Sequence, residues 1–152
     1  MENQNKKFPF PQADDFSKII LLINLDDEKK LSDKELLGKY LGDIVERQVM
    51  YYISACQYLG LINENKEYTE LGNKIRQYDS MRQNIELAKL IVKDDIFGTV
   101  FFYQQMLGVS LEKSEIINIM REYIDLSKDG IYKRRSQTVV KWVEWITENL
   151  NK

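Results

Sequence analysis

Arginine, glutamine and hydroxyl side chains near the middle of the chain could recognise another molecule. When residues 43–59 are drawn as a helix, Arg47, Gln48, Tyr51 and Ser54 share one face, opposite an apolar stripe. Arginine can pair with guanine and glutamine with adenine, each through two hydrogen bonds. This face therefore predicts a recognition helix that reads the base edges of double-stranded DNA.

The same face has an ordinary alternative role. Arg47 could neutralise Glu46 or Asp43, and Tyr51 could simply cover the surface of the protein. Charged helix starts are common on solvated faces, so the residue pattern leaves both interpretations open.

A second cluster of basic and polar side chains lies near the C-terminus. It consists of Lys133, Arg134, Arg135, Ser136, Gln137 and Thr138. We expect a helix to begin at about Ser136, so guanidinium groups and free backbone amides would meet there, as in sites that hold a phosphate. In the alternative role, one arginine pairs with Asp125 or Asp129 of the preceding turn. Lys66 is a further candidate for a phosphate contact, with an ordinary solvated lysine as its alternative.

The composition excludes much familiar enzyme chemistry. The 152 residues contain no histidine and one cysteine, Cys56, so a His/Cys zinc site, a histidine base and a Ser-His-Asp triad are ruled out. A nuclease-like set of Asp14 or Asp15 with Glu28–Lys30 would lie on a helix and a loop rather than at a sheet edge. We expect no catalytic residues, no bound metal and no cofactor.

Charge and hydropathy place the protein in a broad class. Hydrophobic residues make up 43% and charged residues 30%, which is typical of a globular domain, and the net charge of −2 neither favours nor forbids nucleic acid. From Ile131 to Lys152 there are five basic and two acidic residues, so the C-terminal segment is locally basic. The opening MENQNKK lacks an apolar signal core and no run suits a membrane span, which predicts a cytoplasmic protein that makes no membrane contact.

The first half of the chain has the signals of a helix-turn-helix. A helix is predicted over 14–25, capped by Asp14 or Asp15, and Ser32 with Glu35 forms a capping box for a short helix that ends at Gly42. Asp43 and Glu46 repeat the capping-box spacing before a helix that reaches about Leu59. Its expected buried stripe is Val45, Val49, Tyr52, Ile53, Cys56 and Leu59.

A small β-ribbon, or wing, is predicted directly after these helices. Leu61 and Ile62 on one side and Tyr68 on the other flank a polar turn, in which Asn65 is expected to adopt the left-handed conformation. A helix-turn-helix followed by such a ribbon is a winged helix.

The second half is expected to be continuously helical. Apolar periodicity predicts helices over 69–77, 81–92, 95–107, 111–124 and 136–150. Trp142 lies on the apolar stripe of the last helix, which favours core packing over base stacking, whereas the position of Trp145 is open. Phe101, Phe102 and Tyr103 are interpreted as a buried helix segment, with a homodimer interface as the alternative.

Four segments give the chain a family resemblance. They are Glu46–Tyr52, Tyr58–Ile62, Tyr68–Gly72 and Lys133–Trp142, which read ERQVMYY, YLGLI, YTELG and KRRSQTVVKW. Together they resemble a winged-helix family of bacterial restriction-modification proteins, where the module often sits beside a type II endonuclease domain. The resemblance runs from about Pro11 to Ile146. It implies sequence-directed DNA binding in a restriction or defence setting and supplies no catalytic role.

These observations predict a mainly α fold: a winged helix-turn-helix with a small β-ribbon wing, followed by a second helical half of winged-helix-like order. We expect residues 1–12 to be a flexible leader, 13–78 the winged helix-turn-helix, and 79–152 a C-terminal helical half packed on it. The expected function is DNA binding as a regulator or as a specificity or accessory subunit of a restriction-modification or related defence system. Its expected partners are double-stranded DNA and a restriction endonuclease or methyltransferase. The alternative is a protein-interaction module that scaffolds a nuclease without binding DNA.

Overall fold

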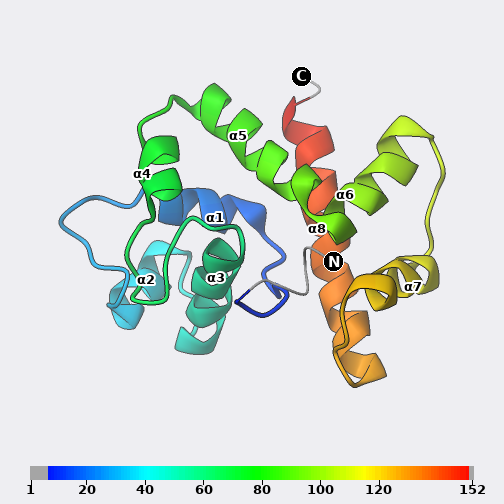
Figure 1. Ribbon diagram of the computed structural model, residues 1–152. Coiled ribbons are helices and arrows are strands. Elements are labelled where there is room, and N and C mark those ends of the chain that lie inside the picture. Colours follow the sequence, from blue (N-terminus) through cyan, green and yellow to red (C-terminus); the bar gives the residue numbers. More distant parts are fainter. Residues whose placement is uncertain (1–6, 151–152) are drawn as a thin grey trace. The chain divides into compact units, whose positions relative to one another are not determined.

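The computed structural model describes residues 7–150, and its regular structure is helical (Figure 1). The helices are α1 (Phe16–Ile23), α2 (Lys34–Tyr40), α3 (Glu46–Tyr58), α4 (Glu70–Arg76), α5 (Ser80–Lys93), α6 (Asp95–Phe101), the π-helix η2 (Phe102–Met106), α7 (Lys113–Tyr123) and α8 (Asp129–Leu150). The predicted mainly α architecture is confirmed. Within residues 7–150, every helix is too short or too polar to cross a membrane.

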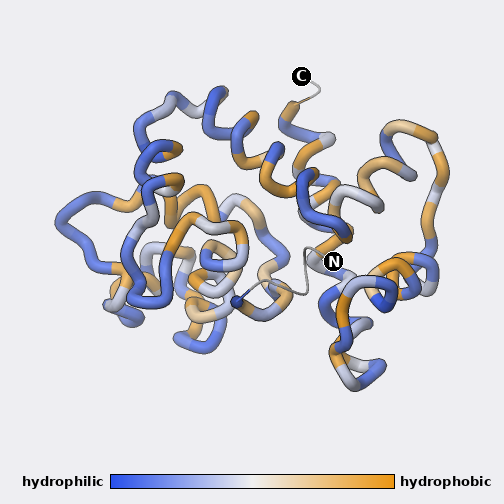
Figure 2. The backbone as a smooth tube through the Cα atoms, in the orientation of Figure 1, coloured by the Kyte–Doolittle hydropathy of each residue, from blue (hydrophilic) through white to orange (hydrophobic). Residues whose placement is uncertain are grey.

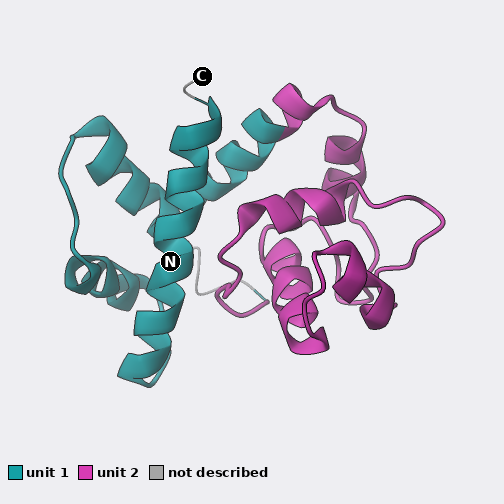
Figure 3. Cartoon of the chain, turned by 180° about the vertical axis from the view of Figure 1, so that it is seen from behind, with its two compact units in different colours: residues 1–7, 84–152 teal, residues 8–83 magenta. Residues whose placement is uncertain are grey.

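The chain folds into two compact units, coloured separately in Figure 3. Unit 2 spans Phe8–Gln83, and unit 1 comprises Lys7 and residues 84–150 of the described chain. The division falls inside α5 rather than at the expected boundary after residue 78. Part of the predicted flexible leader, residues 1–6, lies outside the described residues. Residues 8–12 of the predicted leader belong to unit 2. There Phe10 is buried, and its ring meets that of Tyr58 edge to face at 5.6 Å.

The core of unit 2 is built where α1 packs against α3 and α4 and where α2 packs against α3. The predicted stripe of α3 is largely confirmed, since Val49, Tyr52, Ile53 and Cys56 are all buried. Val45 was expected to join them and does not, because it precedes the first turn of α3 and is 65% exposed.

The ends of the first helices follow local signals, with two corrections. Asp15 caps α1 and Gly42, at φ 98°, terminates α2, both as predicted. Asp33 rather than Ser32 caps α2, because the helix starts one residue later than the capping-box spacing implies. The second predicted capping box is also wrong. Asp43 adopts φ 61° within the turn, and the residue at the N-cap of α3 is Val45, whose side chain cannot cap.

The predicted β-ribbon wing is not formed. The segment contains one isolated antiparallel bridge, between Ile62 and Tyr68, and no strand occurs in the part of the chain that the structure describes. Two backbone bonds join its sides, from the amide of Asn63 to the carbonyl of Glu67 and from the amide of Thr69 to the carbonyl of Leu61. The amides of Asn65 and Glu67 instead donate to the Asn63 side-chain oxygen, so the pairing stays at a single bridge. Lys66, at φ 60°, and not Asn65, takes the left-handed position.

Unit 1 forms its core where α6, α7 and α8 pack against one another. Trp142 is fully buried, and its ring stacks on that of Phe97 with centroids 4.7 Å apart. The predicted core role of Trp142 is confirmed, and Trp145 is buried as well.

Helix α8 begins at Asp129, well before the predicted start at Ser136. The buried Tyr132 explains the earlier start, because its hydroxyl accepts from the amide of Leu126 and donates to the carbonyl of Ile124. Tyr132 thereby satisfies backbone groups of the preceding turn, and the left-handed residue of that turn is Ser127, at φ 70°. Gly130 lies inside the helix.

Candidate nucleic-acid interface

The turn between α2 and α3 is tightly held (Figure 1). The Lys18 ammonium group donates to the carbonyl of Leu41 at the end of α2 over 2.7 Å. The amide of Ile44 donates to the carbonyl of Gly38 over 3.0 Å, and a Cβ atom on Gly38 would lie 2.7 Å from the Ile44 oxygen. Gly38 thus permits the close approach that fixes the start of α3. Sequence reasoning passed over this residue, although an interior helical glycine is a signal of close packing.

The outward face of α3 carries the predicted recognition residues. Arg47 is exposed, its Nε atom donates to the Tyr51 hydroxyl over 2.8 Å, and its guanidinium carbon lies 5.7 Å from the Tyr51 ring centroid. Gln48 is exposed, whereas Ser54 is half-buried. Within residues 7–150, Arg47 forms no ion pair with either Glu46 or Asp43, so its observed partner is Tyr51.

Lys66 lines a cavity between the turn that follows α3 and the loop between α1 and α2. The Gln57 side-chain amide donates to the carbonyl of Asn63 over 2.9 Å and so fastens the turn to α3. This cavity, of about 430 Å³, separates the turn from the loop between α1 and α2. The charged side chains that line it are Asp26, Asp27, Lys29, Lys30, Lys66, Glu67 and Arg76.

Ion pairs engage only some of these charges. Lys29 pairs with Asp26 at 3.1 Å, and Arg76 pairs with Asp27 at 2.7 Å. Lys30 and Lys66 take part in none of the ion pairs found among residues 7–150. These two ammonium groups can therefore meet an anion without breaking an existing pair.

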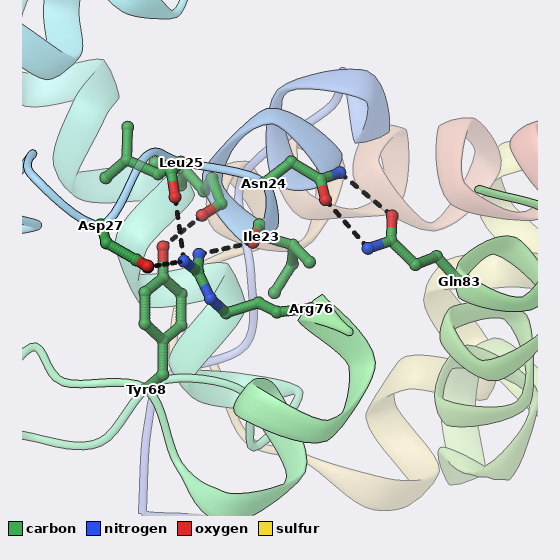
Figure 4. Close-up of polar contacts among 8 residues, drawn as sticks. Ile23, Asn24, Leu25, Asp27, Tyr68, Arg76 and Gln83 are labelled. Carbon is green, nitrogen blue, oxygen red and sulfur yellow. Dashed lines mark hydrogen bonds and ion pairs between the residues drawn. The ribbon is translucent and has the colours of Figure 1, made fainter. Parts of the chain in front are cut away.

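Arg76 has a structural role that sequence reasoning missed. Its guanidinium donates to the carbonyls of Ile23 and Leu25 at 2.7 and 3.0 Å, and it lies over the ring of Tyr68 (Figure 4). The Tyr68 hydroxyl donates to the carbonyl of Leu22. Together these contacts satisfy carbonyls at the end of α1 and position the loop that lines the cavity. No spacing rule connects Arg76 with residues about fifty positions earlier, so only the fold reveals this cap.

Burial shifts the pKa values of three side chains in unit 2. It raises the pKa of Tyr68 to about 12, although the nearby Arg76 acts in the opposite direction. Burial also raises the pKa of Tyr52, whose hydroxyl accepts from the backbone amide of Asp15. The fully buried Cys56 thiol has a strongly raised pKa and stays protonated at neutral pH, which makes it a packing residue and a poor nucleophile.

The second predicted cluster lies within α8, in unit 1. The helix start expected at Ser136 is wrong, because residues 134–138 are inside the helix and their amides belong to its hydrogen-bond ladder rather than being free for a phosphate. Ser136 and Thr138 are fully buried, and the Ser136 hydroxyl donates to the carbonyl of Lys133. Lys133, Arg134 and Gln137 are exposed, and Arg135 is half-buried. The predicted partner Asp129 instead pairs with Arg121, at 2.5 Å.

The structure therefore separates the predicted residues into two sets. Arg47, Gln48, Tyr51, Ser54 and Lys66 belong to unit 2, and the residues from Lys133 to Thr138 belong to unit 1. The first set holds the candidate recognition face, and the second keeps an exposed basic face on α8. Among residues 7–150, no three acidic or cysteine side chains converge as metal ligands would.

Comparisons with known proteins place the chain in a family. Searches among curated proteins and among solved structures find no significant match. A protein family described as "Domain of unknown function (DUF7226)" matches residues 18–151. That match covers residues 84–150 of unit 1 and all but the first part of unit 2, including both candidate residue sets. The chain therefore belongs to the DUF7226 family of domains of unknown function.

Proposed function

We propose that unit 2 binds double-stranded DNA through the outward face of α3. The observation that carries this proposal is the pair of neighbouring exposed side chains, Arg47 and Gln48, on the second helix of a helix-turn-helix, with Arg47 oriented by Tyr51. A positioned guanidinium can donate two hydrogen bonds to guanine, and the amide of Gln48 can pair with adenine. The proposed fold is a helix-turn-helix in which a short turn replaces the wing.

Lysines at the cavity would hold the DNA backbone. Lys30 and Lys66 are free of ion pairs within the described chain and line the same hollow, so both can meet phosphate oxygens. The exposed Lys133 and Arg134 of α8 are candidates for additional contacts that do not depend on the DNA sequence.

By its resemblance to restriction-associated winged helices, the protein would serve as a regulator or as a specificity or accessory subunit beside an endonuclease or methyltransferase.

Two double variants test the proposal by fluorescence anisotropy on a panel of duplexes at several salt concentrations. Arg47→Ala with Gln48→Ala should erase preference between duplexes, at about 1–3 kcal/mol for each lost two-bond contact, while residual binding remains. Lys30→Ala with Lys66→Ala should weaken binding to every duplex. It should also flatten the plot of log K against log salt by about 0.9 for each lost phosphate contact.

A matched control and two contrary outcomes complete this test. Lys128→Ala removes an exposed lysine from unit 1 and should leave both preference and salt slope unchanged. Wild-type protein that binds no duplex at about 50 mM salt would refute DNA binding. Wild-type affinity in both double variants would show that DNA binds elsewhere.

A protein-interaction module is the second candidate function, and the charge of unit 2 favours it. Residues 8–83 contain 10 Lys and Arg against 13 Asp and Glu, a net charge of −3. Such a charge weakens non-specific attraction to DNA. This candidate predicts a stable complex with an endonuclease or methyltransferase and no DNA retention at about 50 mM salt.

A further inference from the structure

Residues 96–111 of unit 1 form an uncharged segment with several exposed apolar side chains. No charged residue occurs from Ile96 to Leu111, although 30% of the chain is charged. Its exposed large apolar residues are Phe102 (50%), Tyr103 (39%), Met106 (66%), Leu107 (55%) and Val109 (42%). We call these five residues the η2 surface. Orange stretches mark much of the segment between α6 and α7 in Figure 2.

The backbone of this segment is held in place by its own hydrogen bonds. The amide of Leu107 donates to the carbonyl of Phe102 over 3.0 Å, which closes the wide turn of η2. The amide of Val109 donates to the carbonyl of Tyr103 over 2.8 Å. None of the residues of η2 is buried. The backbone of this segment has its hydrogen bonds within the chain, while its apolar side chains stay exposed to water. Burial against another surface would recover that hydrophobic free energy.

A cavity of about 400 Å³ opens beside the exposed side chains. Val92, Phe102, Tyr103 and Leu107 supply its apolar lining, and Lys93, Asp94 and Asp95 are its charged residues. Asp94 is buried and accepts hydrogen bonds from the amides of Ile96 and Phe97, so Lys93 and Asp95 place charges of both signs at the rim. Met106 is the most exposed residue of the η2 surface and is not part of this lining. One unit thus carries both a highly exposed, flexible apolar side chain and a cavity with an apolar side that can receive one.

We propose that the η2 surface is the interface of a two-fold symmetric homodimer, in which Met106 of each copy enters the cavity of the other. A projection and a hollow on the same chain are satisfied reciprocally by two-fold symmetry, the commonest symmetry of soluble oligomers. The surface has the composition of an interface core, rich in aromatic residues and methionine and depleted of charge.

Charge complementarity selects a second copy over an unrelated partner. Because Lys93 and Asp95 flank the same cavity, two-fold pairing allows Lys93 of each copy to meet Asp95 of the other. A surface with one positive and one negative charge at its rim is complementary to a second copy of itself. A strongly basic partner would repel Lys93, and a strongly acidic partner would repel Asp95. This inference is independent of DNA binding and concerns a different unit.

Sedimentation velocity over about 1–100 µM protein tests the dimer. Wild type should approach twice the chain mass of 18.0 kDa, and Met106→Lys should weaken dimerisation at least about tenfold. Met81→Lys is the matched control, since Met81 is 74% exposed at the start of α5 in unit 2 and should leave the dimer intact. Val109→Lys provides a second disruption at the η2 surface, and circular dichroism should show wild-type helix content in all three variants.

Three outcomes would overturn the dimer. Wild type that stays at the monomer mass at about 100 µM would leave the η2 surface to another kind of protein. Dimerisation of Met106→Lys and Val109→Lys with wild-type affinity would place any dimer interface elsewhere. Equal loss of dimer in Met81→Lys would show that the response is to added charge and not to this surface.

Discussion

The guanidinium of Arg76 lies 4.1 Å from the ring centroid of Tyr68, and both side chains donate hydrogen bonds to the same end of α1. Arg76 reaches the carbonyls of Ile23 and Leu25, and Tyr68 reaches that of Leu22. Tyr68 and Arg76, which follow α3 in the chain, thus cap the C-terminal end of α1. Because the two side chains stack on each other, they act together as one cap and position the loop between α1 and α2 that lines the cavity.

Arg76→Lys should destabilise the protein by about 2–3 kcal/mol, because an ammonium group cannot span two carbonyls and a carboxylate as the guanidinium fork does. Urea unfolding followed by circular dichroism measures the loss. Arg134→Lys, at an exposed position of α8, is the control and should change the unfolding free energy by less than about 0.5 kcal/mol. A cost below about 1 kcal/mol for Arg76→Lys would mean that solvent replaces the cap.

Tyr68 should make the protein less stable in alkali. Its pKa in the fold is about 12, above the ordinary value of 10.0, so folding favours the protonated phenol. A raised pKa contributes stability that is complete below pH 10 and is lost as the pH rises towards 12. The unfolding free energy should therefore fall across this range, and less steeply in Tyr68→Phe. An identical pH slope in the variant would show that Tyr68 titrates normally.

Periodic and local signals made much of the fold predictable. The stripe of α3 follows from the spacing of its apolar residues, and Asp15 and Gly42 act within one turn of their own positions. Such signals depend on neighbouring residues alone. The outward face of α3 could be located for the same reason, because it lies opposite the stripe, and its role in recognition stays a prediction.

The errors arose where particular side-chain hydrogen bonds, which apolar periodicity does not encode, decide the outcome. The start of α8 depends on Tyr132, whose hydroxyl satisfies the preceding turn, so the helix begins at Asp129 and not at the predicted Ser136. The absence of a β-ribbon reflects the Asn63 side chain, which takes the Glu67 amide that would otherwise pair with the Asn63 carbonyl. The cap formed by Arg76 joins segments that only the tertiary fold brings together.

Two glycines in helices should respond oppositely to alanine. A Cβ atom on Gly72 would lie 2.2 Å from the carbonyl oxygen of Leu61, so Gly72→Ala must displace backbone and should cost more than about 2 kcal/mol. Gly130 has nothing within 4 Å of its Cβ position, and Gly130→Ala should stabilise α8 by up to about 1 kcal/mol. Thermal unfolding of both variants measures the contrast. A stable Gly72→Ala protein would contradict the close approach of α4 to Leu61.

Trp142→Ala should be the most damaging of these substitutions. The side chain is completely buried where α6 and α8 pack, with its ring stacked on Phe97 at an interplanar angle of 18°. Truncation would leave a cavity that this packed core cannot fill, at a cost of about 3–5 kcal/mol. Phe102→Ala is the aromatic control and should cost less than about 1 kcal/mol in the monomer, because half of that side chain is already exposed. Chemical unfolding at a protein concentration too low for dimerisation compares the two losses of unfolding free energy. Equal losses would refute the assignment of Trp142 to the core and of Phe102 to the surface.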